Sequence, residues 1–312
     1  MDRVELEGRI RELINHAWDN EVRWPEIENW VTNFNGSYHS KDQEQLHAIY
    51  SITQYMYFGR RLVREMLKSL FRDHFCSPIK QRIRRNFNDT LDFQLIAKFF
   101  DQELINTRFI GVGNPSESGA HLLYYFRQVN GLSKDLFCDL HSIAQVKVDN
   151  NRNPSYIISD DSIKRIVFFD DIVGSGTQAS EYLGRCIQDL KKNSPTLDIK
   201  FMSLFSTTEG LAKLNASKVF DGNAMSLFEL DNTFKCFDVN SRYFQNPPEW
   251  FKLEVMKDVL IKYGTTISRQ FPLGYKDGQL LISFSHNTPD NVPPVYWHSG
   301  IWKPAFLRYH KL

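Results

Sequence analysis

The amino-acid sequence predicts an α/β protein whose parallel sheet is flanked by helices, with a helical N-terminal region and an irregular C-terminal segment. Two observations predict this class. From about residue 106, short apolar runs alternate with loops and with segments of helical spacing, which is typical of strand–loop–helix units and parallel pairing. Before residue 106, apolar residues recur at helical spacing only. The 312 residues can bury a substantial core.

The N-terminal region, residues 1–105, is expected to be helical throughout. Apolar residues follow helical spacing in EGRIRELINHAW, in PEIENWVTNF, in the long run 42–75 broken only by Gly59, and in LDFQLIAKFFDQELI. Pro25 suits the first turn of its helix. These residues form the first of three predicted segments.

The second segment, residues 106–219, carries the predicted sheet. Three apolar runs, TRFIGVG, RIVFFDD and LDIKFMSLFST, are expected to be buried strands. AHLLYYFRQVNG, TQASEYLGRCIQDLKKN and TEGLAKLNAS are the helices that follow them, and VDNNRNPSY is a polar loop. The third segment, residues 220–312, contains one helix in EWFKLEVMKDVLIKYG, a strand in QLLISFSH, and a proline- and tryptophan-rich stretch expected to form a packed cap.

Composition excludes several classes. A net charge of +1 gives no global field that selects nucleic acid or a membrane surface. No apolar stretch is long enough to span a bilayer, and MDRVELEGRIREL lacks the apolar core of a signal peptide. The four cysteines are widely spaced, which disfavours structural zinc and favours reduced thiols. We therefore expect a cytoplasmic protein without a membrane partner.

Positive charge is concentrated in one region. Residues 60–85 contain nine lysines and arginines against Glu65 and Asp73: Arg60, Arg61, Arg64, Lys68, Arg72, Lys80, Arg82, Arg84 and Arg85. A solvated basic helix face is the ordinary explanation. The alternative is a docking surface for nucleic acid or a protein partner.

The most informative stretch is RIVFFDDIVGSGTQ, residues 165–178. A buried strand runs into two adjacent carboxylates, Asp170 and Asp171, and then into a Gly-Ser-Gly-Thr loop before a helix. Glycines let the backbone close around a tetrahedral anion, and a helix N-terminus presents free N–H groups to it. The loop therefore suits a phosphate, and the carboxylates suit hydroxyls or a cation. A ribose 5-phosphate offers both features.

Other interpretations of this stretch fit less well. A Walker B strand requires a GxxxxGK[ST] loop, which the chain lacks, and the glycine loop argues against a receiver-type acidic pocket. Gly111-Val112-Gly113 is a weak dinucleotide fingerprint because Pro115 follows and the third glycine is missing. A plain strand and turn does not explain two charges at the end of a buried strand.

The acidic pair, two apolar residues and Gly-Ser-Gly-Thr resemble the 5-phosphoribosyl-1-pyrophosphate (PRPP) signature of type I phosphoribosyltransferases. The wider chain resembles a divergent branch of that family found in bacterial conflict and phage-defence systems, such as retron-associated effectors. That resemblance covers nearly the full length. It includes QYMYFGRR, RFIGVGNPSESGAHLLYYFR, PLGYKDGQLLISFSHNTPDNVPPVYW and WKPAFLR beside the signature. It implies a phosphoribosyltransferase-type sheet with a C-terminal hood.

The resemblance also implies roles for individual residues. Asp170 and Asp171 would hold the ribose hydroxyls and contact Mg²⁺ indirectly, through the substrate. The 5-phosphate would be bound by Gly174, Ser175, Gly176, Thr177 and Gln178. The pyrophosphate loop would comprise Gly113, Asn114, Pro115, Ser116, Glu117, Ser118 and Gly119, in which Glu117 departs from expectation because it places a negative charge beside an anion.

Two further regions are implied less directly. A flexible loop at 142–160 would close over PRPP and bring Lys147 and Arg152 to the pyrophosphate; exposed loop charges are the ordinary alternative. The hood differs from those of the salvage enzymes, and its polar and aromatic candidates for contact with the acceptor are Asn287, Asp290, Asn291, Trp297 and Trp302. Packing is the more usual role for the two tryptophans.

The resemblance implies a magnesium-dependent enzyme that displaces pyrophosphate from PRPP with an unknown nitrogen acceptor. Two alternatives stay open. The same fold could sense PRPP or a nucleotide without catalysis, or it could be a scaffold whose basic 60–85 region binds nucleic acid or a protein encoded in the same operon.

Overall fold

The computed structural model describes residues 1–113, 118–148, 152–216 and 219–308, without the side chains of 118, 120 and 178–182. These residues form two compact units, one of Arg64–Glu229 and one of Met1–Val63 with Leu230–Leu312. The boundary falls inside helix α4 (Arg60–Ser69). The N-terminal helical region is therefore divided: residues 1–63 belong to one unit and the helices after Val63 to the other. The three sequence segments, with boundaries at 105 and 219, do not coincide with this division.

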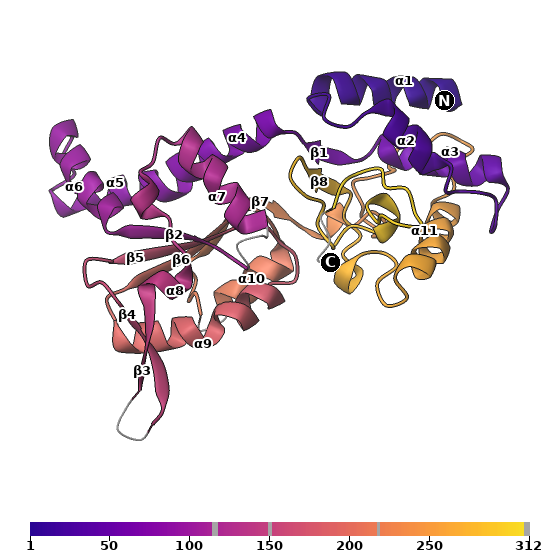
Figure 1. Cartoon of the computed structure of the whole chain (residues 1–312). Coiled ribbons are helices and arrows are strands. Elements are labelled where there is room, and N and C mark those ends of the chain that lie inside the picture. Colours follow the sequence, from indigo (N-terminus) through magenta and orange to yellow (C-terminus); the bar gives the residue numbers. More distant parts are fainter. Residues whose placement is uncertain (114–117, 149–151, 217–218, 309–312) are drawn as a thin grey trace. The chain divides into compact units, whose positions relative to one another are not determined.

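The unit of Arg64–Glu229 is built on a four-stranded sheet of order β2-β5-β6-β7 (Figure 1). Its strands are β2 (Thr107–Gly111), β5 (Arg165–Val173), β6 (Asp198–Thr207) and β7 (Ala224–Leu230). β2 and β6 both pair with β5 in parallel, as the strand–loop–helix pattern predicts. The sheet continues past residue 219, because β7 lies in the segment expected to form the hood.

Helices cover both faces of this sheet. α7 (Ser118–Val129) lies on one face and α9 (Thr177–Asn193) on the other, and α10 (Thr208–Ala216) follows β6 (Figure 1). The remaining helices of this unit are η2 (Leu70–Cys76), α5 (Ser77–Asn86), α6 (Phe93–Ile105), η3 (Lys134–Leu136) and α8 (Leu140–Ile143). The predicted α/β class with a parallel sheet is confirmed.

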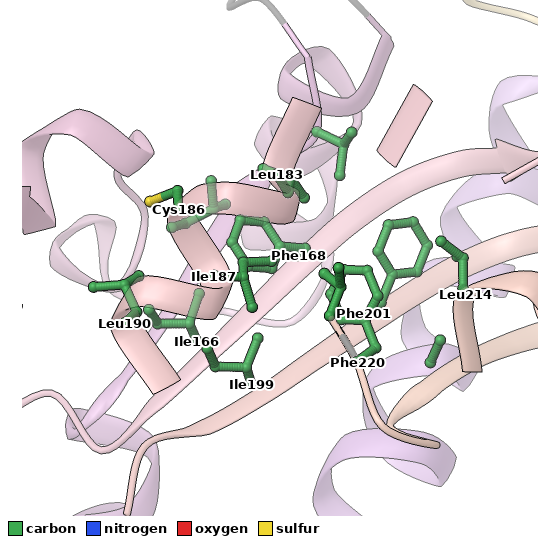
Figure 2. Packing of buried hydrophobic residues seen from close by; sticks show 14 of the residues in the cluster. Ile166, Phe168, Leu183, Cys186, Ile187, Leu190, Ile199, Phe201, Leu214 and Phe220 are labelled. Atoms are coloured by element: carbon green, nitrogen blue, oxygen red, sulfur yellow. The ribbon is translucent and has the colours of Figure 1, made fainter. Parts of the chain in front are cut away.

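The face under α9 holds the main core of the unit. Figure 2 shows Ile187 and Leu190 of α9 against Ile166 and Phe168 of β5. These four side chains are fully removed from water. The other face packs against α7, where Phe126 lies 4.9 Å from Phe169 between ring centroids. Residues of β5 therefore alternate between two apolar layers, as a strand covered on both faces requires.

The second unit joins N- and C-terminal parts of the chain. Its elements are α1 (Arg3–Glu12), η1 (Leu13–Ala17), α2 (Trp24–Val31), α3 (Lys41–Ile52), β1 (Met56–Phe58), η4 (Asn232–Phe234), α11 (Leu253–Ile267), η5 (Tyr275–Asp277), β8 (Ile282–Phe284) and η6 (Pro294–Tyr296). β1 pairs in parallel with β8. Trp30 and Trp302 both donate their indole N–H to the carbonyl of Val295, which ties α2 to the C-terminal stretch.

Two predicted elements differ from the structure. The run 42–75 is not one helix interrupted at Gly59, since α3 ends at Ile52 and β1 follows. Pairing with β8, more than two hundred residues later, overrides the local helical spacing there. The loop predicted at 142–160 is an antiparallel hairpin of β3 (Ala144–Val148) and β4 (Pro154–Ile158). Residues 144–148 alternate apolar and polar side chains, as a strand does, but the polar, proline-containing sequence that follows favoured a loop.

Candidate functional site

The acidic pair lies at the carboxyl edge of the sheet, where ligands of parallel α/β proteins bind. The pairing of β2 with β5 ends at Gly111 opposite Phe169, and one further bond joins Val112 N–H to the Phe169 carbonyl at 2.9 Å. β5 continues to Val173, still paired with β6 on its other side. Asp170 and Asp171 thus extend beyond the end of β2, inside the strand rather than after it.

The two carboxylates differ in burial. Asp170 is in register with Ser203 of β6, on the α9 face, and is partly exposed. Asp171 is buried, with 4% of its surface exposed. Each carboxylate accepts the next backbone N–H: Asp171 N–H donates to Asp170 Oδ1 at 2.9 Å, and Ile172 N–H to Asp171 Oδ1 at 2.8 Å. Both side chains are therefore held against the strand.

The glycine loop follows directly. Gly176 has φ +64° and is the N-cap of α9, so it occupies the left-handed region that favours glycine. A Cβ at this position would meet the carbonyl oxygen of Gly210 at 2.8 Å. The hydroxyl of Ser175 donates to that of Thr177 at 3.1 Å. The loop therefore brings two hydroxyls and the first N–H groups of α9 to one place.

Residues outside the signature brace this loop. Thr207, at the end of β6, donates its hydroxyl to the carbonyl of Gly174 at 2.5 Å and accepts the N–H of Gly210 at 2.9 Å. Lys213 of α10 donates to Thr177 Oγ1 at 2.9 Å. Sequence analysis did not identify these residues as part of the site. The available signal was that the carboxyl end of the next predicted strand, FST, must lie beside that of β5.

The predicted pyrophosphate loop is described at its two ends only. Gly113 has φ +94°, a conformation that favours glycine. At the other end, a Cβ on Gly119 would meet the carbonyl oxygens of Val112 and Phe169 at 2.9 and 3.0 Å, so α7 approaches the ends of β2 and β5 closely. Asn114, Pro115, Ser116 and Glu117 lie outside the described residues, as do the side chains of Ser118 and Gln178.

The two predicted loop cations lie on the β3–β4 hairpin, which extends away from the sheet in Figure 1. Lys147 is exposed and in register with Ser155, and Arg152 is exposed with φ +64°. β4 is attached to α9, since Tyr156 N–H donates to Asp189 at 3.2 Å and Asn193 donates to the Tyr156 carbonyl at 2.8 Å.

All the hood candidates belong to the other unit. Trp302 is 7% exposed and Asn291 is also buried, donating to the Tyr275 carbonyl at 3.3 Å. Trp297 is partly exposed, donates to the Val292 carbonyl at 2.8 Å and stacks under the guanidinium of Arg308. The remaining two are Asp290, which lies 3.8 Å from Arg308, and Asn287, whose side-chain oxygen is buried without a hydrogen-bond partner among the described residues.

Much of the positive charge of residues 60–85 is paired with carboxylates. Five of the nine cations form ion pairs: Arg60 with Glu21, Arg61 with Asp19, Lys68 with Glu65, Arg72 with Asp73 and Arg82 with Glu103. Arg64 and Lys80 lie over aromatic rings instead. Three of these carboxylates, Asp19, Glu21 and Glu103, lie outside the region, so its positive charge is balanced more than its own sequence indicates.

The described residues hold no group of three or more His, Cys, Asp or Glu side chains arranged to bind a metal ion. Two adjacent carboxylates at the sheet edge nevertheless suit Mg²⁺, which prefers oxygen ligands and is commonly held partly by substrate phosphates. Within the described part of the chain, every helix is too short or too polar to cross a lipid bilayer.

A family model described as PRTase-CE, where PRTase abbreviates phosphoribosyltransferase, matches residues 27–308. The chain belongs to this family. Membership of PRTase-CE confirms the resemblance to phosphoribosyltransferases at the level of the family. Its place in phage defence or in retrons stays a prediction. No curated protein sequence matches this PRTase-CE chain.

Solved phosphoribosyltransferases show a weak structural likeness. The xanthine-guanine-hypoxanthine phosphoribosyltransferase of Helicobacter pylori is 14% identical, with a TM-score of 0.28, over 56% of this chain and 86% of that one. A purine phosphoribosyltransferase from Pyrococcus horikoshii OT3 is 14% identical, with a TM-score of 0.27, over 56% and 87%. The orotate phosphoribosyltransferase of Aeropyrum pernix is 14% identical, with a TM-score of 0.25, over 54% and 76%.

Proposed function

We propose that this PRTase-CE protein is a PRPP-dependent phosphoribosyltransferase-like effector that acts in the cytoplasm in bacterial anti-phage defence. It displaces pyrophosphate from PRPP with a nitrogen acceptor whose identity is unknown. One observation carries the proposal: β5 contains the Asp170–Asp171 pair and leads, through the glycine loop, to a left-handed Gly176 that caps α9 at the carboxyl edge of a parallel sheet. Phosphate-binding and hydroxyl-binding groups are thereby adjacent.

In this proposal each group has a defined task. The N–H groups at the start of α9, with the Ser175 and Thr177 hydroxyls, bind the 5-phosphate. Asp170 and Asp171 accept hydrogen bonds from the ribose hydroxyls. The nitrogen acceptor attacks the anomeric carbon as its bond to the pyrophosphate oxygen breaks, through an oxocarbenium-like state. Catalysis then comes from positioning and from stabilising the charge of the leaving pyrophosphate.

Pyrophosphate departs toward the loop that begins at Gly113 and ends at Gly119. Gly113 has the left-handed backbone that favours glycine, and the missing Cβ of Gly119 lets α7 approach the carbonyl oxygens of Val112 and Phe169. Magnesium would be held mainly by PRPP oxygens, with Asp170 and Asp171 acting through the substrate, and it would neutralise charge on the pyrophosphate. Lys147 and Arg152 would reach this anion only if the β3–β4 hairpin changes position, as a closing loop does.

The first test is calorimetric titration of the purified protein with PRPP and Mg²⁺, beside the Asp170→Asn/Asp171→Asn double variant. Saturable binding that the double variant loses supports the ligand site. No binding by the folded wild-type protein overturns both the enzyme and the PRPP-sensor hypotheses.

A catalytically silent PRPP or nucleotide sensor is the second candidate, because a binding site needs the same loop and acidic pair. Release of pyrophosphate when candidate nitrogen acceptors are added distinguishes an enzyme from a sensor. The scaffold hypothesis has less support, since most cations of the 60–85 region are engaged within the protein. Arg84 and Arg85 do not pair with carboxylates among the described residues. Salt-sensitive binding of nucleic acid that is lost in the Arg84→Ala/Arg85→Ala variant would support the scaffold hypothesis.

A further inference from the structure

A cavity lies at the outer edge of the sheet, beside β2. Its volume is about 480 Å³, within the range of small-molecule sites. Apolar side chains from four separate parts of the unit line it: Ile110 of β2, Leu123 of α7, Phe137 after η3, and Leu183 of α9. The cavity is therefore formed by the tertiary fold rather than by one surface groove.

The course of the chain explains why the cavity exists. After η3 the backbone meets β2 at a single point, where Phe137 pairs with Phe109 and Cys138 N–H donates to the Phe109 carbonyl at 3.3 Å. It then turns into α8 instead of continuing beside β2. The space beside Ile110 and Gly111, which another strand would otherwise occupy, is left to the cavity.

Charge in the lining is predominantly positive. Arg127 and Lys134 carry full positive charges, His141 adds a further basic group, and Asp139 is the carboxylate that lines the cavity. Asp139 Oδ1 already accepts the N–H of Ser142 at 2.9 Å, as the N-cap of α8. Arg127 lies near the ring of Tyr124, another lining residue, at 5.9 Å from its centroid. Apolar walls with two cations in the lining fit a ligand that has an apolar body and an anionic group.

We propose that this cavity binds a small aromatic anion, separately from the PRPP site. The flat ring system lies among Ile110, Leu123 and Leu183, and the anionic group pairs with Arg127 and Lys134. Gly113, where the proposed pyrophosphate loop begins, also lines the cavity, so the cavity lies next to that loop. The side chains that bind the aromatic anion belong neither to the acidic pair nor to the glycine loop of α9.

Cys138 provides a local reporter for the cavity. It lines the cavity and is only partly buried, whereas Cys76, Cys186 and Cys236 are buried. Burial raises the pKa of the Cys138 thiol to about 11, so the thiol is protonated near neutral pH and reacts slowly. A ligand in the cavity should slow its alkylation further.

The experiment compares two fluorescent probes on the full chain. 1-Anilinonaphthalene-8-sulfonate carries one negative charge, and N-phenyl-1-naphthylamine has the same rings without the sulfonate. We expect the sulfonate probe to bind saturably at one site and to protect Cys138 from N-ethylmaleimide. The neutral probe should bind about tenfold more weakly, because it lacks the charge-assisted contact. Arg127→Gln should remove most of that tenfold preference.

Matched variants separate this proposal from the proposed function. Arg185→Gln changes an exposed arginine of α9 outside the lining, and Asp171→Asn alters the PRPP site; both should bind the sulfonate as wild type does. The proposal is overturned by equal affinity for the two probes, by sulfonate binding that leaves Cys138 unprotected, or by competitive displacement with pyrophosphate. The last result would make the cavity part of the PRPP site. Failure of PRPP to bind would leave these results unaffected.

Discussion

Asp170 and Ser203 are paired in the register of β5 and β6, and both lie on the face covered by α9. Ser203 is fully buried, and its hydroxyl has no hydrogen-bond partner among the described residues. A buried hydroxyl without a hydrogen bond is unfavourable, so Ser203 lowers the free energy of unfolding at a position next to the candidate site.

We expect Ser203→Ala to leave the free energy of unfolding unchanged or to raise it by up to about 1 kcal/mol, since no hydrogen bond is lost. The matched control is Ser206→Ala on the same strand. Its hydroxyl is also fully buried but donates to the Thr207 carbonyl at 3.0 Å, and the loss should be about 1 kcal/mol. Chemical denaturation of both variants measures the contrast. Equal destabilisation would show that Ser203 has a partner in solution.

Gly176→Ala should destabilise the protein by about 2 kcal/mol or more, because a left-handed backbone and a close carbonyl both oppose a Cβ. It should also weaken PRPP binding by distorting the start of α9. Gly184→Ala, in the interior of the same helix, is the control: its Cβ would meet only Val219, at 3.8 Å. That variant should gain about 0.5–1 kcal/mol. Thermal denaturation and calorimetry distinguish them, and unchanged stability of Gly176→Ala would contradict the cap geometry.

Arg165 is a buried cation whose loss should be severe. It is 3% exposed and forms ion pairs with Glu103 at 2.9 Å and with Asp198 at 2.7 Å. Arg165→Met leaves both carboxylates without this partner, and we expect a loss of about 3–5 kcal/mol. Arg82→Met removes a half-exposed partner of the same Glu103 and should cost less than about 1 kcal/mol. Denaturant titration tests the difference in free energy of unfolding.

His47 should make the stability of the unit of Met1–Val63 and Leu230–Leu312 depend on pH. Burial lowers the pKa of its imidazole below the ordinary 6.5, and its Nε2 accepts the N–H of Lys252 at 3.0 Å, which requires the neutral form. The unfolded state therefore binds more protons as pH falls below 6.5, so the stabilising contribution is complete above 6.5 and is lost as pH falls through the folded-state pKa.

His47→Gln should accordingly lose less stability than wild type between pH 7 and about 5. His16→Gln is the control, because the His16 side chain is 76% exposed. Denaturation at a series of pH values provides the measurement. Parallel pH profiles for wild type and His47→Gln would contradict the assignment.

The strand–loop–helix order of residues 107–216 was predictable because each of these elements has a recognisable pattern in its own stretch of sequence. Four apolar residues before Asp170 give a buried strand, and Gly174 and Gly176 give the loop. What escaped prediction depends on distant pairing. β1 is a strand because it meets β8, and the 142–160 hairpin is ordered by Asp189 and Asn193 of α9.

The same reasoning applies to the site. Asp170, Asp171 and the glycine loop were visible in one stretch of sequence, but the position of the acidic pair inside the strand became clear only from the continuation of β5 to Val173. Thr207 and Lys213 join the site because β6 lies beside β5, and no local pattern marks either residue. The neutralisation of the basic region was likewise hidden, since Glu103, Asp19 and Glu21 lie outside it.

The bracing of the Gly174 carbonyl by Thr207 has a consequence for how the protein is made. Thr207 lies 33 residues after Gly174, and Gly210 and Lys213 follow it. A nascent chain that has released only the signature stretch from the ribosome lacks all three. The loop can acquire its final conformation only after β6 and α10 have emerged, so the anion-binding centre matures late in translation of this unit, as a property of the completed sheet.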